Sequence, residues 1–420
     1  MDKRADRIYL CLAHMSDTGA EQKYVQEAFD TNWVVPLGPN VNGFEKDLED
    51  FVGQSKRVVA LSSGTAAVHL GLLACGVGPG DEVLVQSFTF CASSHPITYL
   101  GATPVFIDSE KDTWNMDPEL LEEAIKDRIA KTGKKPKAIV PVALYGMPYK
   151  IDRIMEIANR YEIPVVEDAA EGFGSKFNGQ VIGTFGNYGV LSFNGNKIIT
   201  TSGGGALITA DDESWREIMM YATQYRESYP YYQHEKIGFN YRMSNICAGI
   251  GRGQMTVVED HIAHHKKVQK LYEELLSDVK GITVHSQPAT GEYDSNYWLC
   301  TITLDPDMKV KGQENAYRQV VTGAVGGAAG VIHAAKSTHT DCEPNANVEA
   351  MRMGLDALNI EGRPLWKPMH KQPVYKDAPA YVNGVSEALF KVGMCLPAGP
   401  YVKEEEVRYI CEAIKSLIEE

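Results

Sequence analysis

Short apolar runs alternate with longer amphipathic stretches between residues 57 and 210, and this alternation predicts an α/β fold. Most of the apolar runs are continuous, which is typical of strands buried on both faces of a mostly parallel sheet. Helices are predicted between them, for example over Ala66–Cys75 and Pro118–Ile129. Seven strands are predicted, over Arg57–Leu61, Glu82–Gln86, Pro104–Ile107, Ala138–Val142, Pro164–Glu167, Gly189–Phe193 and Ala206–Thr209.

The pattern changes in the second half of the chain. A stretch with few helix breakers predicts a long helix from Asp260 towards Leu276. Tyr297–Leu304 and Leu358–Arg363 have strand patterns with helical segments between them. We therefore expect a large domain over residues 1–255 and a smaller α+β domain over residues 256–420. The segment Gly323–Asn347 begins with a run rich in Gly and Ala and is interpreted as an insertion loop.

The overall charge excludes some classes of function. The 420 residues carry a formal net charge of -14, which argues against binding to DNA or RNA because such proteins present a basic surface. No stretch reaches the roughly 20 apolar residues that span a bilayer, and the apolar run near the N-terminus is too short for a signal peptide. The eight cysteines lack C-x-x-C spacing, so we expect no metal site and a cytoplasmic protein with free thiols.

A turn of small residues, Ser63-Gly64-Thr65-Ala66, joins the first predicted strand to an apolar helix. Small residues allow the backbone to approach an anion, and the free N–H groups at a helix start favour a phosphate there. An ordinary strand–helix turn, in which a serine caps the helix, fits the same residues. The turn is therefore a candidate phosphate site, with the capping role as the alternative.

Two carboxylates, Glu167 and Asp168, close a predicted strand that is too apolar to lie on the surface. A carboxylate at the C-terminal end of such a strand faces the crevice where α/β proteins bind ligands. The alternative is that Asp168 caps a following helix.

Lys197 lies just past a predicted strand, in a turn rich in Gly and Ser, and another strand follows. Most lysines are solvated surface charges. A lysine between two buried strands is desolvated instead, which makes a neutral amine available for Schiff-base chemistry. A phosphate site at the Ser63 turn with Ser192, an acid at Asp168 and the amine of Lys197 together supply what pyridoxal 5'-phosphate (PLP) needs.

Five stretches in order make this pattern specific. They are Ser63–Ala67, Gly80–Val83, Glu167–Ala170, Ser192-Phe193 with Lys197, and Phe239–Asn245. With them the chain resembles the nucleotide-sugar aminotransferases of the DegT/DnrJ/EryC1/StrS family. The resemblance implies PLP fold type I, the aspartate aminotransferase-like fold, with a mostly parallel seven-stranded sheet and a smaller α+β C-terminal domain. It also implies that Lys197 holds PLP and that Asp168 keeps the pyridine nitrogen protonated.

The resemblance implies further roles for single residues. Phe90 matches the aromatic residue that stacks on the cofactor ring, and Glu171 falls where many relatives carry Gln beside the cofactor's hydroxyl. Asn245 matches a residue that reaches the cofactor of a neighbouring subunit, which implies a homodimer with shared active sites. The chain reads Ser202-Gly203-Gly204-Gly205 where relatives often read Gly-Glu-Gly-Gly, so the glutamate of that motif is missing here. Lys197 favours transamination, because related dehydratases carry histidine at this position.

The sequences Ser192–Thr201, around Lys197, and Arg363–His370 most resemble those of enzymes of the bacillosamine pathway. Those enzymes aminate C4 of UDP-4-keto-6-deoxy-N-acetylglucosamine with L-glutamate as the donor. The alternative is another nucleotide-linked keto sugar, aminated at C3 or carried on GDP or dTDP. A nicotinamide-dependent sugar enzyme is disfavoured because the glycine fingerprint after the first strand is missing. The expected substrate-binding residues are Asn196, Tyr241, Arg242, Arg363, Trp366 and His370.

Overall fold

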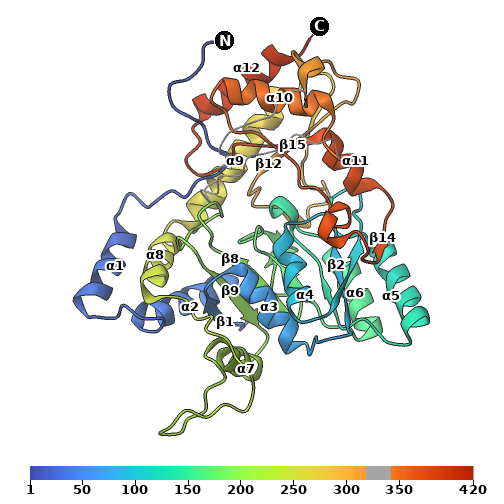
Figure 1. Ribbon diagram of the computed structural model, residues 1–420. Helices are drawn as coiled ribbons and strands as arrows, with labels where there is room; N and C mark the ends of the chain where they lie inside the picture. The colour runs from blue at the N-terminus through green and yellow to red at the C-terminus, as the bar shows by residue number, and fades with distance from the viewer. Residues whose placement is uncertain (318–341, 420) are drawn as a thin grey trace.

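The computed structural model describes residues 1–317 and 342–419. A large part built on one sheet lies below a smaller part built on a second sheet, and helix α9 (Val258–Leu276) runs between them (Figure 1). The long helix expected after Asp260 is thereby confirmed. The Gly- and Ala-rich run Gly323–Ala329 lies outside the described residues.

The large sheet contains the seven strands that the sequence predicts. They are β1 (Arg57–Leu61), β2 (Glu82–Gln86), β3 (Thr103–Ile107), β4 (Ala138–Val140), β5 (Val166–Asp168), β8 (Tyr188–Ser192) and β9 (Gly205–Thr209). Their order is β1-β9-β8-β5-β4-β2-β3, where two parallel bridges, Ile139–Val165 and Val142–Asp168, join β5 to β4. Among these strands only β9 runs antiparallel to its neighbours. The prediction of an α/β fold with a mostly parallel sheet is confirmed.

An eighth strand, β14 (Ala380–Tyr381), comes from the last tenth of the chain and pairs in parallel with β3 at the sheet edge. The sequence analysis missed it because two residues carry no periodicity. A segment that the sequence assigned to the small domain therefore completes the large sheet. The domain division at residue 255 stays a prediction.

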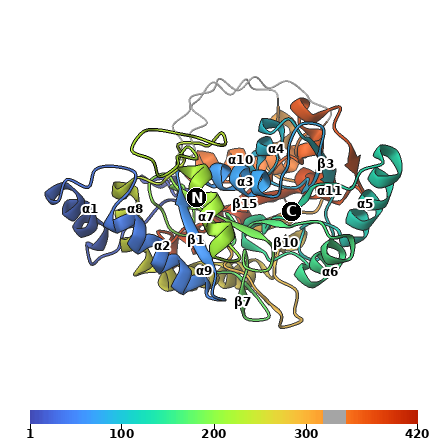
Figure 2. The same cartoon turned by 90° about the horizontal axis from the view of Figure 1, so that it is seen from below.

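Helices surround the large sheet. Seen from below, α1, α2 and α8 lie at one end of the sheet and α5 and α6 at the other (Figure 2). Local sequence sets several bounds: the Asp117 side chain caps α5, Pro118 occupies its first turn, and Gly133 ends it in a left-handed conformation with φ 69°. The helices of this part are α1 (Ala20–Asp30), α2 (Pro39–Val52), α3 (Gly64–Ala74), α4 (His95–Tyr99), α5 (Pro118–Thr132), α6 (Ile151–Tyr161), α7 (Asp212–Ala222) and α8 (Asn245–Met255).

The smaller part has its own sheet, in the order β10-β12-β15-β13, with every pair antiparallel. Its apolar core lies between this sheet and the helices α9, α10 and α12. A two-stranded hairpin, β6 (Lys176–Phe177) and β7 (Gln180–Val181), pairs with β11 (Tyr293–Asp294). The remaining elements are β10 (Ile282–Val284), β12 (Cys300–Leu304), α10 (Ala346–Ala357), β13 (Arg363–Pro364), α11 (Val385–Val392), β15 (Gly393–Leu396) and α12 (Glu404–Leu417).

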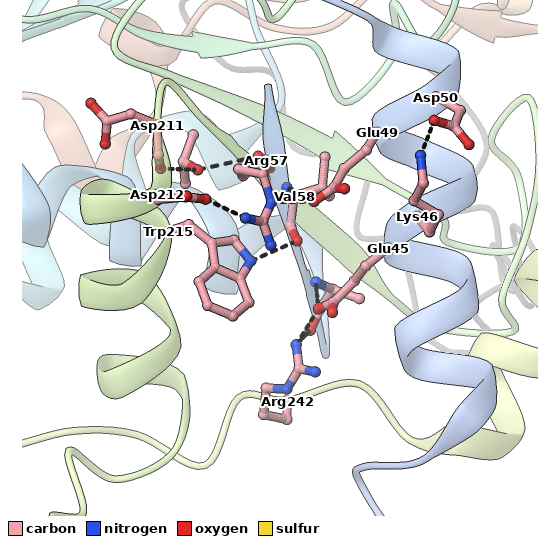
Figure 3. Close-up of polar contacts among 12 residues, drawn as sticks. Glu45, Lys46, Glu49, Asp50, Arg57, Val58, Asp211, Asp212, Trp215 and Arg242 are labelled. Atoms are coloured by element: carbon pink, nitrogen blue, oxygen red, sulfur yellow. Dashed lines mark hydrogen bonds and ion pairs between the residues drawn. The ribbon is translucent and has the colours of Figure 1, made fainter. Parts of the chain in front are cut away.

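Polar contacts fasten helices to β1 at one end of the large sheet (Figure 3). The Arg57 Nε donates to Glu49 of α2 at 2.9 Å, and its guanidinium also pairs with Asp212 of α7. The Arg57 guanidinium carbon lies 4.6 Å from the centroid of the Trp215 ring. Because α2 and α7 are both tied to this strand, the turn that follows it at Ser63 is held in place.

Candidate active site

The ends of three strands bring the candidate phosphate site together. Helix α3 begins directly after β1, and Ser192 is the last residue of β8. A Cβ added to Gly64 would lie 3.0 Å from the Ser192 Cβ, and one added to Gly205 of β9 would lie 2.3 Å from the Gly64 nitrogen. The small residues therefore allow a close approach of backbones that places the Ser192 hydroxyl beside the helix start.

The Ser63 hydroxyl accepts a hydrogen bond from the Ala66 N–H at 3.0 Å, so Ser63 is the N-cap of α3. The capping alternative is confirmed, and it leaves the phosphate role open. The first N–H groups of a helix have no partner within the helix, so those of Gly64 and Thr65 are available to an anion. The helix start and the Ser192 hydroxyl together fit a phosphate group.

Asp168 ends β5 and is only 6% exposed. Its Oδ2 accepts from the Ser93 hydroxyl at 2.6 Å and its Oδ1 from the Ala170 N–H at 3.2 Å. Burial raises the pKa of Asp168, and these hydrogen bonds together with the charge of Lys197 oppose the rise. No helix follows Asp168 in residues 169–175, so the helix-cap alternative is wrong. A buried carboxylate of this kind fits the protonated pyridine nitrogen of PLP.

Lys197 is not a surface lysine, because its side chain is only 13% exposed. Its Nζ lies 3.6 Å from the Glu171 Oε1 and 3.9 Å from the centroid of the Trp298 ring. Burial raises the pKa of Glu171 to about 7, and the charge of Lys197 opposes the rise. The amine therefore lies inside the molecule between a carboxylate and an aromatic ring.

Four aromatic side chains gather near Lys197 and are called here the aromatic cluster: Phe90, Tyr145, Trp298 and Trp366. The Trp366 ring centroid lies 5.1 Å from that of Tyr145, 5.5 Å from that of Phe90 and 6.3 Å from that of Trp298. Phe90 is 54% exposed, so its face is available for stacking. A cavity of about 400 Å³ opens beside Phe90 and Trp366, and its lining includes Lys367. The helix start, carboxylate, amine and aromatic face fit PLP.

Two of the predicted substrate-binding residues belong to this region. Trp366 is part of the aromatic cluster, and the Asn196 carbonyl accepts from the Trp298 Nε1 at 2.6 Å. His370 lies at the end of β2, where its Nδ1 shares a hydrogen bond of 2.6 Å with the Ser87 hydroxyl. Burial lowers the pKa of His370. Arg363 forms two hydrogen bonds to Glu361, at 2.6 and 2.9 Å.

Two other predicted substrate-binding residues, Arg242 and Tyr241, have partners within the chain. The Arg242 side chain is 9% exposed, pairs with Glu45 of α2, and also donates to the Ala60 carbonyl at 3.0 Å (Figure 3). The Tyr241 hydroxyl lies 3.3 Å from the His69 Nδ1 of α3.

Asn245 is 1% exposed and holds the start of α2. Its Oδ1 accepts from Asn40 and Val41 at 2.9 and 3.2 Å, and its Nδ2 donates to the Trp33 carbonyl at 2.9 Å. Contact of Asn245 with a neighbouring subunit stays a prediction.

The sequence analysis missed Ser93, Tyr145 and Trp298. Trp298 lies 102 residues from the Asn196 carbonyl that it contacts, so no local spacing connects the two. Ser93 precedes Asp168 by 75 residues. Tyr145 carried one signal, a position just after the fourth predicted strand, at the edge where ligands bind.

Comparisons with known proteins agree with this geometry. The model of the DegT/DnrJ/EryC1/StrS aminotransferase family matches residues 16–326 and 330–415. EpsN of Bacillus subtilis, described as a pyridoxal phosphate-dependent aminotransferase, is 41% identical over 98% of this chain and 96% of its own length. GDP-perosamine synthase of Escherichia coli O157:H7 is 33% identical over 97% of this chain and 98% of its own length. A family aminotransferase from Brucella abortus superposes with a TM-score of 0.80 at 28% identity, over 95% of both chains.

The fold and site define a PLP-dependent enzyme of fold type I. The chain belongs to the DegT/DnrJ/EryC1/StrS family and is a nucleotide-sugar aminotransferase that uses pyridoxal phosphate. No helix within the described residues is long and apolar enough to cross a membrane. In the same parts of the chain, no group of three or more His, Cys, Asp or Glu side chains could hold a metal ion.

Proposed function

We propose that the enzyme transfers the amino group of L-glutamate to C4 of a UDP-linked 4-keto-6-deoxy-N-acetylhexosamine. The product is UDP-4-amino-4,6-dideoxy-N-acetylglucosamine, an intermediate of amino-sugar and glycan biosynthesis. The observation that carries this proposal is the cavity beside Phe90 and Trp366, which has Lys367 in its lining. Its Trp366 ring lies 6.3 Å from the Trp298 ring that covers the Lys197 amine. An apolar aromatic face and a cation together suit a sugar linked to a diphosphate.

In this proposal each residue of the site has one task. The Lys197 amine holds the cofactor, and when released it moves a proton between the substrate carbon and the cofactor. PLP supplies a protonated ring that withdraws electrons from the carbon bearing the transferred nitrogen. Asp168 keeps that ring protonated, and Phe90 stacks on its face. Ser63, Gly64, Thr65, Ala66 and Ser192 hold the phosphate, and Glu171 lies beside the cofactor's hydroxyl.

Glutamate and the keto sugar use the same site in turn, which gives ping-pong kinetics. Trp366 and Asn196 are proposed to contact the sugar, because Trp366 lines the cavity and Asn196 directly precedes Lys197 in the chain. The intrachain partners of Tyr241, Arg242, Arg363 and His370 favour a supporting role for these four residues.

Borohydride reduction of the yellow holoenzyme tests the site. The reduced cofactor should be found on the peptide that contains Lys197, and Lys197→Ala should be colourless after dialysis. Cofactor on another peptide would overturn the assignment of Lys197.

A panel of keto-sugar nucleotides tests the substrate. The expected product of the UDP-linked 4-keto sugar carries its new amine at C4, as determined by NMR. Among the alternatives, a GDP- or dTDP-linked sugar or amination at C3, the GDP-linked sugar is supported by the 33% identity to a GDP-perosamine synthase. Preferred amination of a GDP-linked sugar would replace the first proposal with this one.

A homodimer with shared active sites is also proposed, in the cytoplasm. The segment between α1 and α2 exposes apolar side chains that suit a contact with a second copy. They include Trp33, Val34, Val35 and Leu37, which are 39%, 51%, 40% and 54% exposed. Light scattering should give twice the chain mass of 46.3 kDa; the mass of a single chain would refute the dimer.

A further inference from the structure

Tyr145, a member of the aromatic cluster that contacts Trp366, has an unusual backbone conformation. Its φ and ψ are 54° and 19°, in the left-handed region that a bulky side chain rarely adopts, and it is 4% exposed. Such a conformation persists where the surrounding contacts fix it, and it is frequent at functional sites. The contacts that fix Tyr145 therefore indicate what the conformation is for.

The backbone N–H and the side-chain hydroxyl of Tyr145 each form a hydrogen bond, to different parts of the chain. Its backbone N–H donates to the Glu171 Oε2 at 2.7 Å. Its hydroxyl accepts from the backbone N–H of Trp366 at 2.9 Å, across 221 residues of sequence. The backbone N–H therefore faces Glu171 in the loop after β5, while the side chain reaches the segment that follows β13.

Glu171 continues the connection to the reactive amine. One carboxylate oxygen accepts from Tyr145, and the other, Oε1, lies 3.6 Å from the Lys197 Nζ. The Asn296 side-chain amide donates to the Glu171 carbonyl at 2.9 Å and so fixes its backbone. An unbroken series of contacts thus joins the Trp366 backbone to the Lys197 amine.

Within the described structure, Lys197 is the cationic group that lies beside the Glu171 carboxylate. The titratable groups that face it are Lys197 after β8, Asp168 on β5, Cys395 on β15 and the Tyr145 hydroxyl. Asp168 is a like charge and cannot stabilise a second carboxylate. A neutral amide oxygen could accept the hydrogen bond from the Tyr145 N–H just as well as the Glu171 carboxylate does. The negative charge of Glu171 therefore matters for Lys197 and not for Tyr145.

We propose that Tyr145 and Glu171 are positioning residues that couple the Trp366 segment to the Lys197 nitrogen. Occupation of the cavity beside Trp366 shifts this segment, Tyr145 transmits the shift through its hydroxyl, and Glu171 changes how strongly it favours a protonated Lys197 nitrogen. The inference rests on the proposed function for Lys197 as the cofactor-holding residue and for the cavity as the sugar-nucleotide site.

The first test is the pH titration of the holoenzyme's absorbance. Glu171→Gln keeps an acceptor for the Tyr145 N–H but removes the charge that favours the protonated nitrogen. The pH midpoint of the absorbance change should therefore fall by about one unit, a tenfold change in the proton equilibrium. Glu171→Asp keeps the charge and should lie nearer to the wild type. An unchanged midpoint in Glu171→Gln overturns the role of Glu171.

The second test adds UDP-N-acetylglucosamine or GDP-mannose, which carry no ketone, to the same titration. One of them should move the midpoint in the wild type. In Tyr145→Phe, which lacks only the hydroxyl, the added nucleotide sugar should move it by less than a third as much. Equal shifts in both proteins, or no shift in the wild type with either compound, overturn the coupling.

Two measurements keep these outcomes separate from other failures. Melting temperatures check that the variants are folded, and a merely structural loss in Tyr145→Phe would lower the melting temperature without removing the response to nucleotide sugar. Borohydride labelling of the wild type checks the proposed function. Cofactor on another lysine refutes the site itself, whereas cofactor on Lys197 with unmoved midpoints refutes only the coupling.

Discussion

Two neighbouring carboxylates on β5 have different surroundings. Glu167 accepts four hydrogen bonds, from the Tyr149 hydroxyl and the N–H groups of Gly183, Phe185 and Gly186, at 2.6–3.0 Å. From the described residues Asp168 accepts two, from Ser93 and Ala170. Because successive side chains of a strand point to opposite faces, Glu167 is held on the far side from Asp168. Glu167 is a structural anchor, and Asp168 has acceptor capacity left for a ligand.

Asp168→Asn is therefore expected to impair catalysis far more than folding. The cationic ring nitrogen would lose its buried counter-charge, at about 3–5 kcal/mol, which lowers kcat/KM by at least about 100-fold. Steady-state kinetics with glutamate measures this. The control Ser93→Ala removes one hydrogen bond worth about 1 kcal/mol and should lower kcat/KM by less than about tenfold. Equal losses in both variants would contradict the assigned role of Asp168.

Arg242 was expected at the substrate, but its contacts predict a loss of stability on substitution. The side chains of Arg242 and Glu45 are 9% and 10% exposed, so Arg242→Met would leave a buried carboxylate unpaired. Breaking such a pair costs about 3–5 kcal/mol. The melting temperature should fall, while KM for the sugar nucleotide in the remaining folded enzyme stays within about twofold. A raised KM with an unchanged melting temperature would instead support direct substrate binding.

At the scale of elements, the position of α3 depends on how closely β9 approaches it. Gly205, in the first position of β9, pairs with Leu61 of β1 and Ser192 of β8. A Cβ at Gly205 would lie 2.3 Å from the Gly64 nitrogen and 2.4 Å from the Ser63 carbonyl carbon. These are backbone atoms, which cannot rotate away, so the strand holds the proposed phosphate site directly.

Gly205→Ala should displace the start of α3 and weaken cofactor binding. Overpacking of this kind costs about 1–3 kcal/mol, so the dissociation constant for PLP should rise at least about fivefold. Fluorescence titration of the apoenzyme with PLP measures it. Gly203→Ala is the matched control two residues earlier, where an added Cβ meets nothing within 4 Å. Equal PLP affinity in both variants would show that α3 does not depend on this approach.

The sequence predicted the large sheet well because its strands are continuous apolar runs separated by clear turns. It also predicted Lys197 and Asp168, since both stand next to buried strands. It missed β14, which has only two residues, and Trp298, whose contact with Lys197 depends on how the second sheet is placed. The partners of Arg242 and Asn245 were equally beyond its reach, because they lie on α2, about 200 residues away in sequence.

At the scale of the whole molecule, an aromatic stack joins the two parts. His285, just after β10 in the smaller part, stacks on Trp114 of the larger part with ring centroids 3.7 Å apart and an interplanar angle of 10°. Another histidine, His265 of α9, is buried and bonds through its Nδ1 to the Tyr297 carbonyl at 3.1 Å. In the described structure the Nε2 atoms of both rings are buried without a hydrogen-bond partner. Neither ring can therefore accept a proton at Nε2 without leaving a buried charge unsolvated.

Acid should weaken the contact between the two parts at His285 and Trp114, and His285→Phe should reduce the loss of stability. Burial lowers the pKa of His285 to about 4 and that of His265 to about 3, below the ordinary 6.5. A folded-state pKa below the unfolded value means that the stability is fully present above pH 6.5 and is lost as the pH falls from there towards the folded pKa. At pH 5 each histidine costs about 2 kcal/mol.

His285→Phe keeps a ring against Trp114 but cannot take up a proton. Its free energy of unfolding in urea should therefore fall by about 2 kcal/mol less than that of the wild type between pH 7 and pH 5. Substitution of the exposed His234 by Gln should leave the wild-type dependence unchanged. If the free energy of unfolding falls equally in all three proteins, protonation of His285 does not limit the stability of the enzyme in acid.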